Sequence, residues 1–264
     1  METCFIGVAG GNTGHFDSTH SIYGIARRPG DAPPTFGQGT KGYEVRQILV
    51  NKFMDSKHDW LLLLDHDMIF ENDTLEKLRS RDKPFISGLY MRRNWRPISP
   101  VWHRPFKKWP MMPWIGDPAP GMLHEIGASG WGCMLMHREV IEKTRIILKG
   151  EPEIIEDDMD VWPYDLAAVL RGDEQLRPLR VDKRDIVGSD VRFPFYAKAA
   201  GITLWGDPDV RPKHILDYPL SPDDYGGVPS GERDEIERNT LKKWEELAYN
   251  VEKLQQQLVE KGDK

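Results

Sequence analysis

The stretch Asp59-Trp60-Leu61-Leu62-Leu63-Leu64-Asp65-His66-Asp67 is the clearest indication of the fold. Five apolar residues in a row predict a strand that is buried on both faces, as in a parallel sheet covered by helices. Two carboxylates follow at the expected carboxyl end of this strand, where open α/β sheets bind their ligands. Because residues i and i+2 of an extended segment point the same way, Asp65 and Asp67 can converge on one hard cation or on a hydroxylated ligand. A solvated acidic turn is the alternative, and the four leucines disfavour it.

The composition is that of a globular protein. The chain has 264 residues, 39% of them hydrophobic and 30% charged, which fits one large domain or one domain with an appendage. A net charge of −6 provides no overall attraction to nucleic acid or to an anionic membrane, although a local patch could. The two cysteines, Cys4 and Cys133, make neither a disulfide framework nor a metal site, so we expect buried thiols. We expect no signal peptide, no membrane span and a cytoplasmic location, in a bacterium or in a phage-infected host.

The order of the predicted elements is that of an α/β domain. A glycine-rich turn, Gly10 to Gly14, follows the first strand and can either cradle a phosphate or serve as a plain strand-to-helix turn. Asp73-Thr74-Leu75-Glu76 has the form of a capping box. We expect strands at 3–9, 60–64, 84–90, 130–136 and 202–205, helices at 18–27, 43–55, 138–143 and 189–201 with another after residue 73, and a mobile loop at 28–42.

The C-terminal part is predicted to be separate from a catalytic domain at 1–218. Residues 219–231 are rich in proline and glycine and are expected to form a linker. Residues 232–264 are expected to form an amphipathic helix, which either packs back on the domain or pairs with a second copy in a homo-oligomer. Its apolar stripe comprises Trp244, Leu247, Val251, Leu254 and Leu258.

An irregular segment at 91–121 is rich in aromatic and basic residues. Five of the nine tryptophans lie between residues 95 and 131. The rings of Trp95, Trp102 and Trp131 can stack on sugar faces, while nearby arginines and lysines can meet a phosphate. The same mixture suits a single-stranded or flipped nucleic-acid base. A small satellite core is the structural alternative for each tryptophan.

Several motifs in this order resemble the GT-A glycosyltransferases, particularly the family-2-like enzymes of bacteria and their phages. The resemblance covers about residues 3 to 216. It rests on the D-x-D motif at Asp65-His66-Asp67, the helix around Arg46, the glycine-rich segment Gly127 to Met136, the segment Gly188 to Phe193 and the later His214. Gln47 and Ser189 depart from the usual Asn and acidic residue. The resemblance implies an α/β GT-A fold, with a mostly parallel central sheet flanked by helices, here followed by the long C-terminal helix.

The resemblance also implies a function. It is metal-dependent transfer of a sugar from a nucleotide-sugar donor, expected to be a UDP-sugar, to a hydroxyl of a glycan or of a modified phage DNA base. Mn²⁺, or Mg²⁺ in its place, would neutralise the leaving diphosphate. The expected roles are Asp65, Asp67 and His214 for the metal, Asp65, Arg46 and Gly10 for the donor, Asp190 as the base of an inverting transfer, and Trp131, Gly130 and Trp95 for the acceptor.

Other interpretations remain open at this point. Asp190 can instead be a helix N-cap. His66-Asp67 also occurs in metal-dependent phosphohydrolases, but that chemistry needs the pair on a helix. A non-catalytic carbohydrate- or nucleic-acid-binding module would keep the tryptophans without needing the carboxylates and His214 together.

Overall fold

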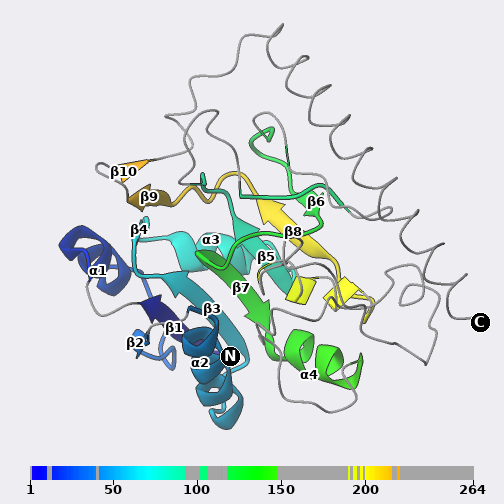
Figure 1. The fold of residues 1–264 in the computed structure, drawn as a ribbon, viewed down its shortest axis with the longest axis horizontal. Coiled ribbons are helices and arrows are strands. Elements are labelled where there is room, and N and C mark those ends of the chain that lie inside the picture. Colours follow the sequence, from blue (N-terminus) through cyan, green and yellow to red (C-terminus); the bar gives the residue numbers. More distant parts are fainter. Residues whose placement is uncertain are drawn as a thin grey trace, which may run out of the picture.

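The structure is a computed structural model, and it describes most of the expected catalytic domain (Figure 1). The described residues are 2–10, 14–39, 42–92, 101–105, 114, 118–147, 190, 193–194, 197–198, 200–215 and 219–220. The expected acceptor residue Trp95, the remainder of the expected linker and the expected C-terminal helix lie outside these residues. The domain boundaries and the homo-oligomer therefore stay predictions.

A mixed, mostly parallel sheet forms the centre of the fold. Its strand order is β2-β1-β3-β7-β5-β8-β6. β1 pairs in parallel with β2 and β3, and β5 with β8, whereas β7 is antiparallel to β3 and β5, and β6 is antiparallel to β8. Five of these seven strands thus run in one direction, which confirms the expected α/β fold class with a mostly parallel central sheet flanked by helices. The bounds are β1 Cys4–Gly10, β2 Thr35–Gln38, β3 Trp60–Asp65, β5 Phe85–Gly88, β6 His124–Ile126, β7 Cys133–His137 and β8 Leu204–Asp207.

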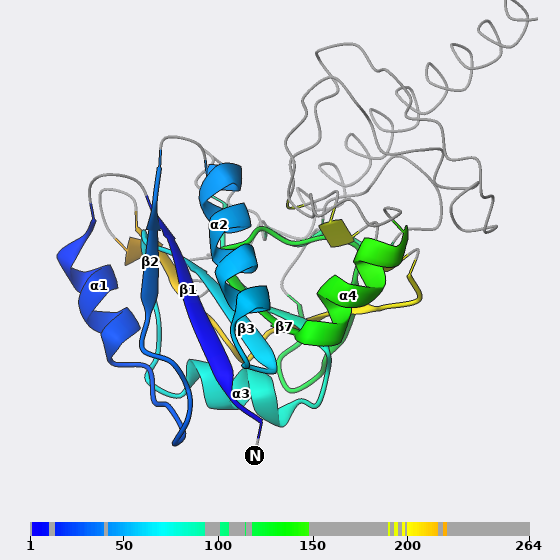
Figure 2. The same ribbon diagram turned by 90° about the horizontal axis from the view of Figure 1, so that it is seen from below.

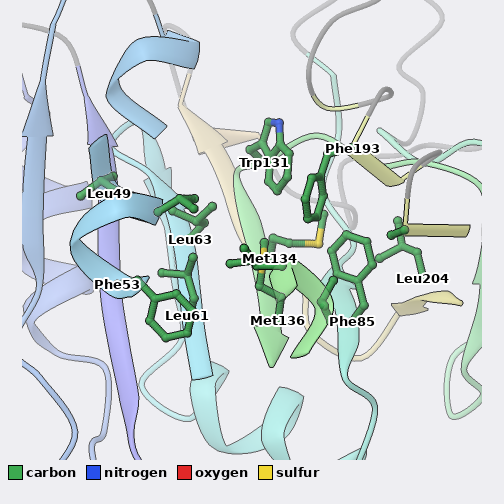
Figure 3. Packing of buried hydrophobic residues seen from close by; sticks show 14 of the residues in the cluster. Leu49, Phe53, Leu61, Leu63, Phe85, Trp131, Met134, Met136, Phe193 and Leu204 are labelled. Carbon is green, nitrogen blue, oxygen red and sulfur yellow. The ribbon is translucent and has the colours of Figure 1, made fainter. Parts of the chain in front are cut away.

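Helices cover both faces of the sheet (Figure 2). On β3, Leu61 and Leu63 belong to the core cluster that includes α2 (Gly42–Asp55) and α4 (Arg138–Ile147). Leu62 and Leu64 point to the other face, into the cluster with α1 (Phe16–Tyr23) and α3 (Thr74–Ser80). Figure 3 shows the first cluster, with Leu49 and Phe53 of α2 beside the leucines of β3. The uninterrupted run of leucines is therefore explained by burial on both faces.

A second, three-stranded sheet joins the end of β3 to the C-terminal part of the domain. It consists of β4 (Met68–Ile69), β9 (Lys213–Ile215) and β10 (Pro219–Leu220), all antiparallel. Met68 pairs with His214, so the residue after Asp67 lies opposite the predicted metal ligand. β10 falls on residues that the sequence analysis assigned to the linker.

Two local predictions were wrong. The segment expected to be a loop at 28–42 contains the edge strand β2, in which Gly37 approaches α2 so closely that a Cβ there would lie 2.7 Å from Val45 Cγ1. Asp73 makes no side-chain cap hydrogen bond at the start of α3, so the capping box is not formed. Its carboxylate instead lies 3.1 Å from Lys77 Nζ, while Glu76 pairs with Arg28 and Arg79.

Two smaller expectations were tested as well. Cys4 and Cys133 are buried free cysteines, as predicted, and burial raises the pKa of each thiol to about 12. In the parts of the chain that the structure describes, the helices are too short or too polar to cross a bilayer.

Arg138 ties α4 to the end of α2, and its replacement should destabilise the domain. Its guanidinium donates to the carbonyls of Phe53, Met54, Ser56 and His58 at 2.8–3.1 Å. These residues lie at or just after the end of α2, where a helix has fewer intrahelical partners for its carbonyls. Arg138→Met should lower the free energy of unfolding by roughly 2–4 kcal/mol, because charge-assisted hydrogen bonds to several carbonyls are lost. Urea unfolding measures this.

Lys143→Met is the matched control, because Lys143 makes an exposed i,i+4 pair with Glu139 on the same helix. Its effect should stay within about 0.5 kcal/mol. Equal effects of the two substitutions would contradict the proposed role of Arg138.

Candidate functional site

Asp65 is the last residue of β3 and is held by a charged partner on α2. Its Oδ1 accepts a hydrogen bond from Arg46 Nη2 at 2.8 Å. Burial lowers the pKa of Arg46, but the charge and hydrogen bond of Asp65 act in the opposite direction, and the net shift is upward. Both side chains are about one-fifth exposed, which leaves them within reach of a ligand (19% and 23%). The arginine and the carboxylate predicted to bind the donor are therefore together.

Asp67 and His214 form the second pair of predicted residues that the structure brings together. His214 Nε2 lies 3.8 Å from Asp67 Oδ1, and the backbone amide of Ile215 donates to the Asp67 carbonyl at 2.9 Å. His214 Nδ1 lies 2.9 Å from the Met91 carbonyl oxygen. Since a carbonyl only accepts, Nδ1 carries the hydrogen, and it is Nε2 that faces the carboxylate. Metal-binding histidines are commonly oriented by such a hydrogen bond from the other ring nitrogen.

The Asp67–His214 pair fits a divalent cation. Two ligand bonds of about 2.1 Å at a right or wider angle place their donor atoms roughly 3–4 Å apart, which matches the observed separation. Among the described residues no group of three or more His, Cys, Asp or Glu side chains is arranged for a metal. Asp65, predicted as a third ligand, is instead hydrogen-bonded to Arg46. Substrate oxygens or water would have to complete the coordination.

Asp190 belongs to the same electrostatic environment. It has helical backbone, as do the described residues Phe193, Pro194 and Ala197 that follow it. Burial raises the pKa of Asp190, the positive charges of Arg46 and Arg92 oppose that rise, and the charge of Asp65 adds to it. The charge of Arg46 thus lowers the pKa of Asp190, the candidate base, while its side chain is hydrogen-bonded to Asp65, the candidate donor carboxylate.

The end of β5 contributes residues that the sequence analysis did not single out individually as site residues. Tyr90 is buried; its hydroxyl accepts a hydrogen bond from the Gly132 amide at 2.9 Å. Its ring meets that of His214 edge-on, with centroids 5.8 Å apart. Met91 supplies the carbonyl for His214, and Arg92 follows. These residues end or follow the strand predicted at 84–90, so the rule that applied to Asp65 could have found them.

Gly130 and Trp131 have packing roles in this structure. A Cβ at Gly130 would overlap the Tyr90 hydroxyl, so this position requires glycine. Trp131 is 2% exposed and contacts Phe193, with ring centroids 5.4 Å apart. Trp102, another predicted stacking residue, is fully buried. Both rings are packed in the core, which is the alternative that the sequence analysis left open. An acceptor contact of Gly130 or Trp131 stays a prediction.

Gly10 lies beneath His66 at the end of β1. The His66 amide donates to the Ala9 carbonyl at 2.9 Å, and a Cβ at Gly10 would come within 3.2 Å of the His66 ring. Residues 11–13 lie outside the described part, so a phosphate-binding turn at Gly10 stays a prediction.

Comparisons with known proteins found similarity in structure. No protein-family model and no curated protein matches the sequence. The crystal structure of A197 from STIV has a TM-score of 0.49 and 17% identity, over 84% of this chain and 91% of that one. The crystal structure of GalNAc-T7 with UDP, GalNAc and Mn²⁺ has a TM-score of 0.48 and 14% identity, over 83% of this chain but 44% of that one. At these identities the likeness concerns the fold alone.

Proposed function

We propose that this protein is a metal-dependent glycosyltransferase that moves a sugar from a nucleotide-sugar donor, a UDP-sugar, to a hydroxyl acceptor. The observation that carries the proposal is the arrangement at the end of β3, where Asp65 is held by Arg46 and Asp67 faces His214 Nε2 at 3.8 Å. One carboxylate is thus oriented by a cation, and the other shares a cation-sized gap with an imidazole. This combination suits a nucleoside diphosphate bound together with a divalent ion.

In this proposal Asp67 and His214 hold Mn²⁺ or Mg²⁺, with Asp65 contacting the metal through water. The bound ion would supply positive charge to the leaving diphosphate. Asp65, oriented by Arg46, binds the donor ribose, and Gly10 lies next to the phosphates. Each of these residues follows or packs against a carboxyl end of β1 or β3, the edge where such sheets bind ligands.

Asp190 is proposed as the base of an inverting transfer. It would take the proton of the acceptor hydroxyl while that oxygen bonds to the anomeric carbon and the bond to the diphosphate breaks. Burial raises the pKa of Asp190, which makes the carboxylate a better proton acceptor. Trp95 is proposed to contact the acceptor, a glycan or a modified phage DNA base.

The phosphohydrolase alternative has less support. His66 and Asp67 lie in the turn between β3 and β4 rather than on a helix. A helical His-Asp pair is what that chemistry needs.

Donor binding should depend on a divalent metal and on Asp67. Calorimetric titration with UDP should give an affinity with Mn²⁺ at least ~10-fold higher than with chelator, and Asp67→Asn should remove that difference because a metal ligand is lost. Asp73→Asn, which removes a carboxylate exposed at the start of α3, is the matched control and should behave as wild type. Equal affinity of wild type with and without metal would overturn the proposal.

A further inference from the structure

Arg92 is fixed beside the candidate metal pair by its neighbours in the chain. The preceding residue, Met91, offers its carbonyl to His214 Nδ1 at 2.9 Å, and Tyr90 packs its ring against the same histidine. The Tyr90 carbonyl accepts a hydrogen bond from Val101 at 3.0 Å. The backbone that carries Arg92 is therefore tied to both His214 and the 101–105 segment.

The side chain of Arg92 has an unusual partner for a half-buried arginine. Its Nη2 lies 2.9 Å from His103 Nε2. Burial, together with the charge of Arg92, lowers the pKa of His103 to about 3, so the imidazole is neutral and Nε2 accepts the hydrogen bond. The guanidinium is thus held in one orientation by a group that does not neutralise its charge.

Three of the other buried or partly buried arginines in the described chain differ in this respect. Arg46, Arg79 and Arg81 each form an ion pair with an aspartate at 2.7–2.9 Å. Arg92 forms no ion pair within the described residues. Burial lowers the pKa of Arg92, and the attraction of Asp190 only partly offsets it. A further anion placed at this guanidinium would therefore be stabilised.

We propose that Arg92 binds a phosphate group of the acceptor next to Asp190, so that the acceptor is a phosphate-bearing molecule. This inference rests on the proposed transferase function. We assign the phosphate to the acceptor rather than to the donor because Arg46 is already hydrogen-bonded to the donor carboxylate Asp65 at 2.8 Å. Arg92 forms no ion pair within the described residues, and its charge acts on the candidate base Asp190. An anion held at Arg92 would bring the acceptor hydroxyl within reach of Asp190.

Inorganic phosphate is the probe for the Arg92 site. UDP is a second probe, which reports on the donor site alone. Phosphate is titrated calorimetrically with chelator present, so that no metal can bind it, and UDP is titrated separately with Mn²⁺. Arg92→Gln should weaken phosphate binding by roughly ten- to hundred-fold, because paired charge-assisted hydrogen bonds are lost. Arg92→Lys keeps the charge but not the planar guanidinium, so its affinity for phosphate should lie between those of wild type and Arg92→Gln. UDP affinity and the melting temperature should stay near the wild-type values.

Arg27→Gln removes an exposed arginine that follows α1 and should leave phosphate binding unchanged. Phosphate affinity unaffected by Arg92→Gln, or UDP affinity that falls together with phosphate affinity, would overturn the acceptor assignment. Wild-type protein that binds phosphate through Arg92 but not UDP with Mn²⁺ would instead refute the transferase function and leave Arg92 as an anion site.

Discussion

Asp190→Asn should lower the rate of nucleotide-sugar turnover by ~10²–10⁴-fold, the usual loss when a positioned base is removed. The affinity for UDP should stay nearly unchanged. The charges of Arg46, Arg92 and Asp65 act on this carboxylate, and asparagine keeps its shape but cannot take the acceptor proton. Steady-state kinetics of nucleotide-sugar turnover, together with calorimetric titration of UDP, measures both quantities. Loss of UDP affinity with retained turnover would assign Asp190 to donor binding.

Stability provides an independent readout for the same variant. Because burial raises the pKa of Asp190, the native state binds more protons than the unfolded state between the ordinary and the raised pKa, and stability falls as pH rises through that window. Asp190→Asn should therefore be at least as stable as wild type at neutral pH, with the difference vanishing at low pH. Asp55→Asn, an exposed carboxylate at the end of α2, should change neither turnover nor this pH dependence. A less stable Asp190→Asn would indicate a structural cap.

Trp102→Ala should lower the free energy of unfolding by about 3–5 kcal/mol, the usual cost of removing a large buried ring. Trp102 is fully buried, and its Nε1 donates to the Gly88 carbonyl at 3.1 Å. Gly206 packs on the ring so closely that a Cβ there would lie 2.7 Å away. Chemical denaturation measures the loss.

Trp102→Phe should cost less, since it keeps most of the packing and removes only one of the two side-chain donors to the Gly88 carbonyl, the other being Ser87 Oγ at 3.0 Å. Met122→Ala, at a side chain that is 63% exposed, should stay within about 0.5 kcal/mol. If Trp102→Ala cost under about 1 kcal/mol, a stacking surface would explain Trp102 better than a core residue.

Local pattern was sufficient where burial alone dictates structure. The leucines at 61–64 predicted β3, and its end was placed within one residue of the observed end at Asp65, because a strand buried on both faces needs an unbroken apolar run. Helix α2 was predicted within one residue at its start, from apolar residues at helical spacing. Both features depend on neighbours in the chain.

Local pattern failed where a distant partner competes. The proline- and glycine-rich segment at 28–42 has little strand propensity, yet Gly37 pairs with Ala9 of β1 at the edge of the sheet. The capping box predicted at Asp73 is not formed, because both of its side chains make ion pairs. Asp73 pairs with Lys77, and Glu76 pairs with Arg28 and Arg79. In both places contacts with other segments outweigh a weak local preference.

The candidate site shows the same distinction between what local pattern predicts and what contacts with distant segments decide. That Asp65 and Asp67 stand together at a ligand-binding edge follows from the two-residue period of a strand and the position of its end, both readable in the chain. Their different partners, Arg46 for Asp65 and His214 for Asp67, follow from how α2 and β9 pack onto that edge. The assignment of Trp102 to the core is of the same kind. Such pairings depend on the register between segments far apart in sequence, and that register is set by packing of the whole core.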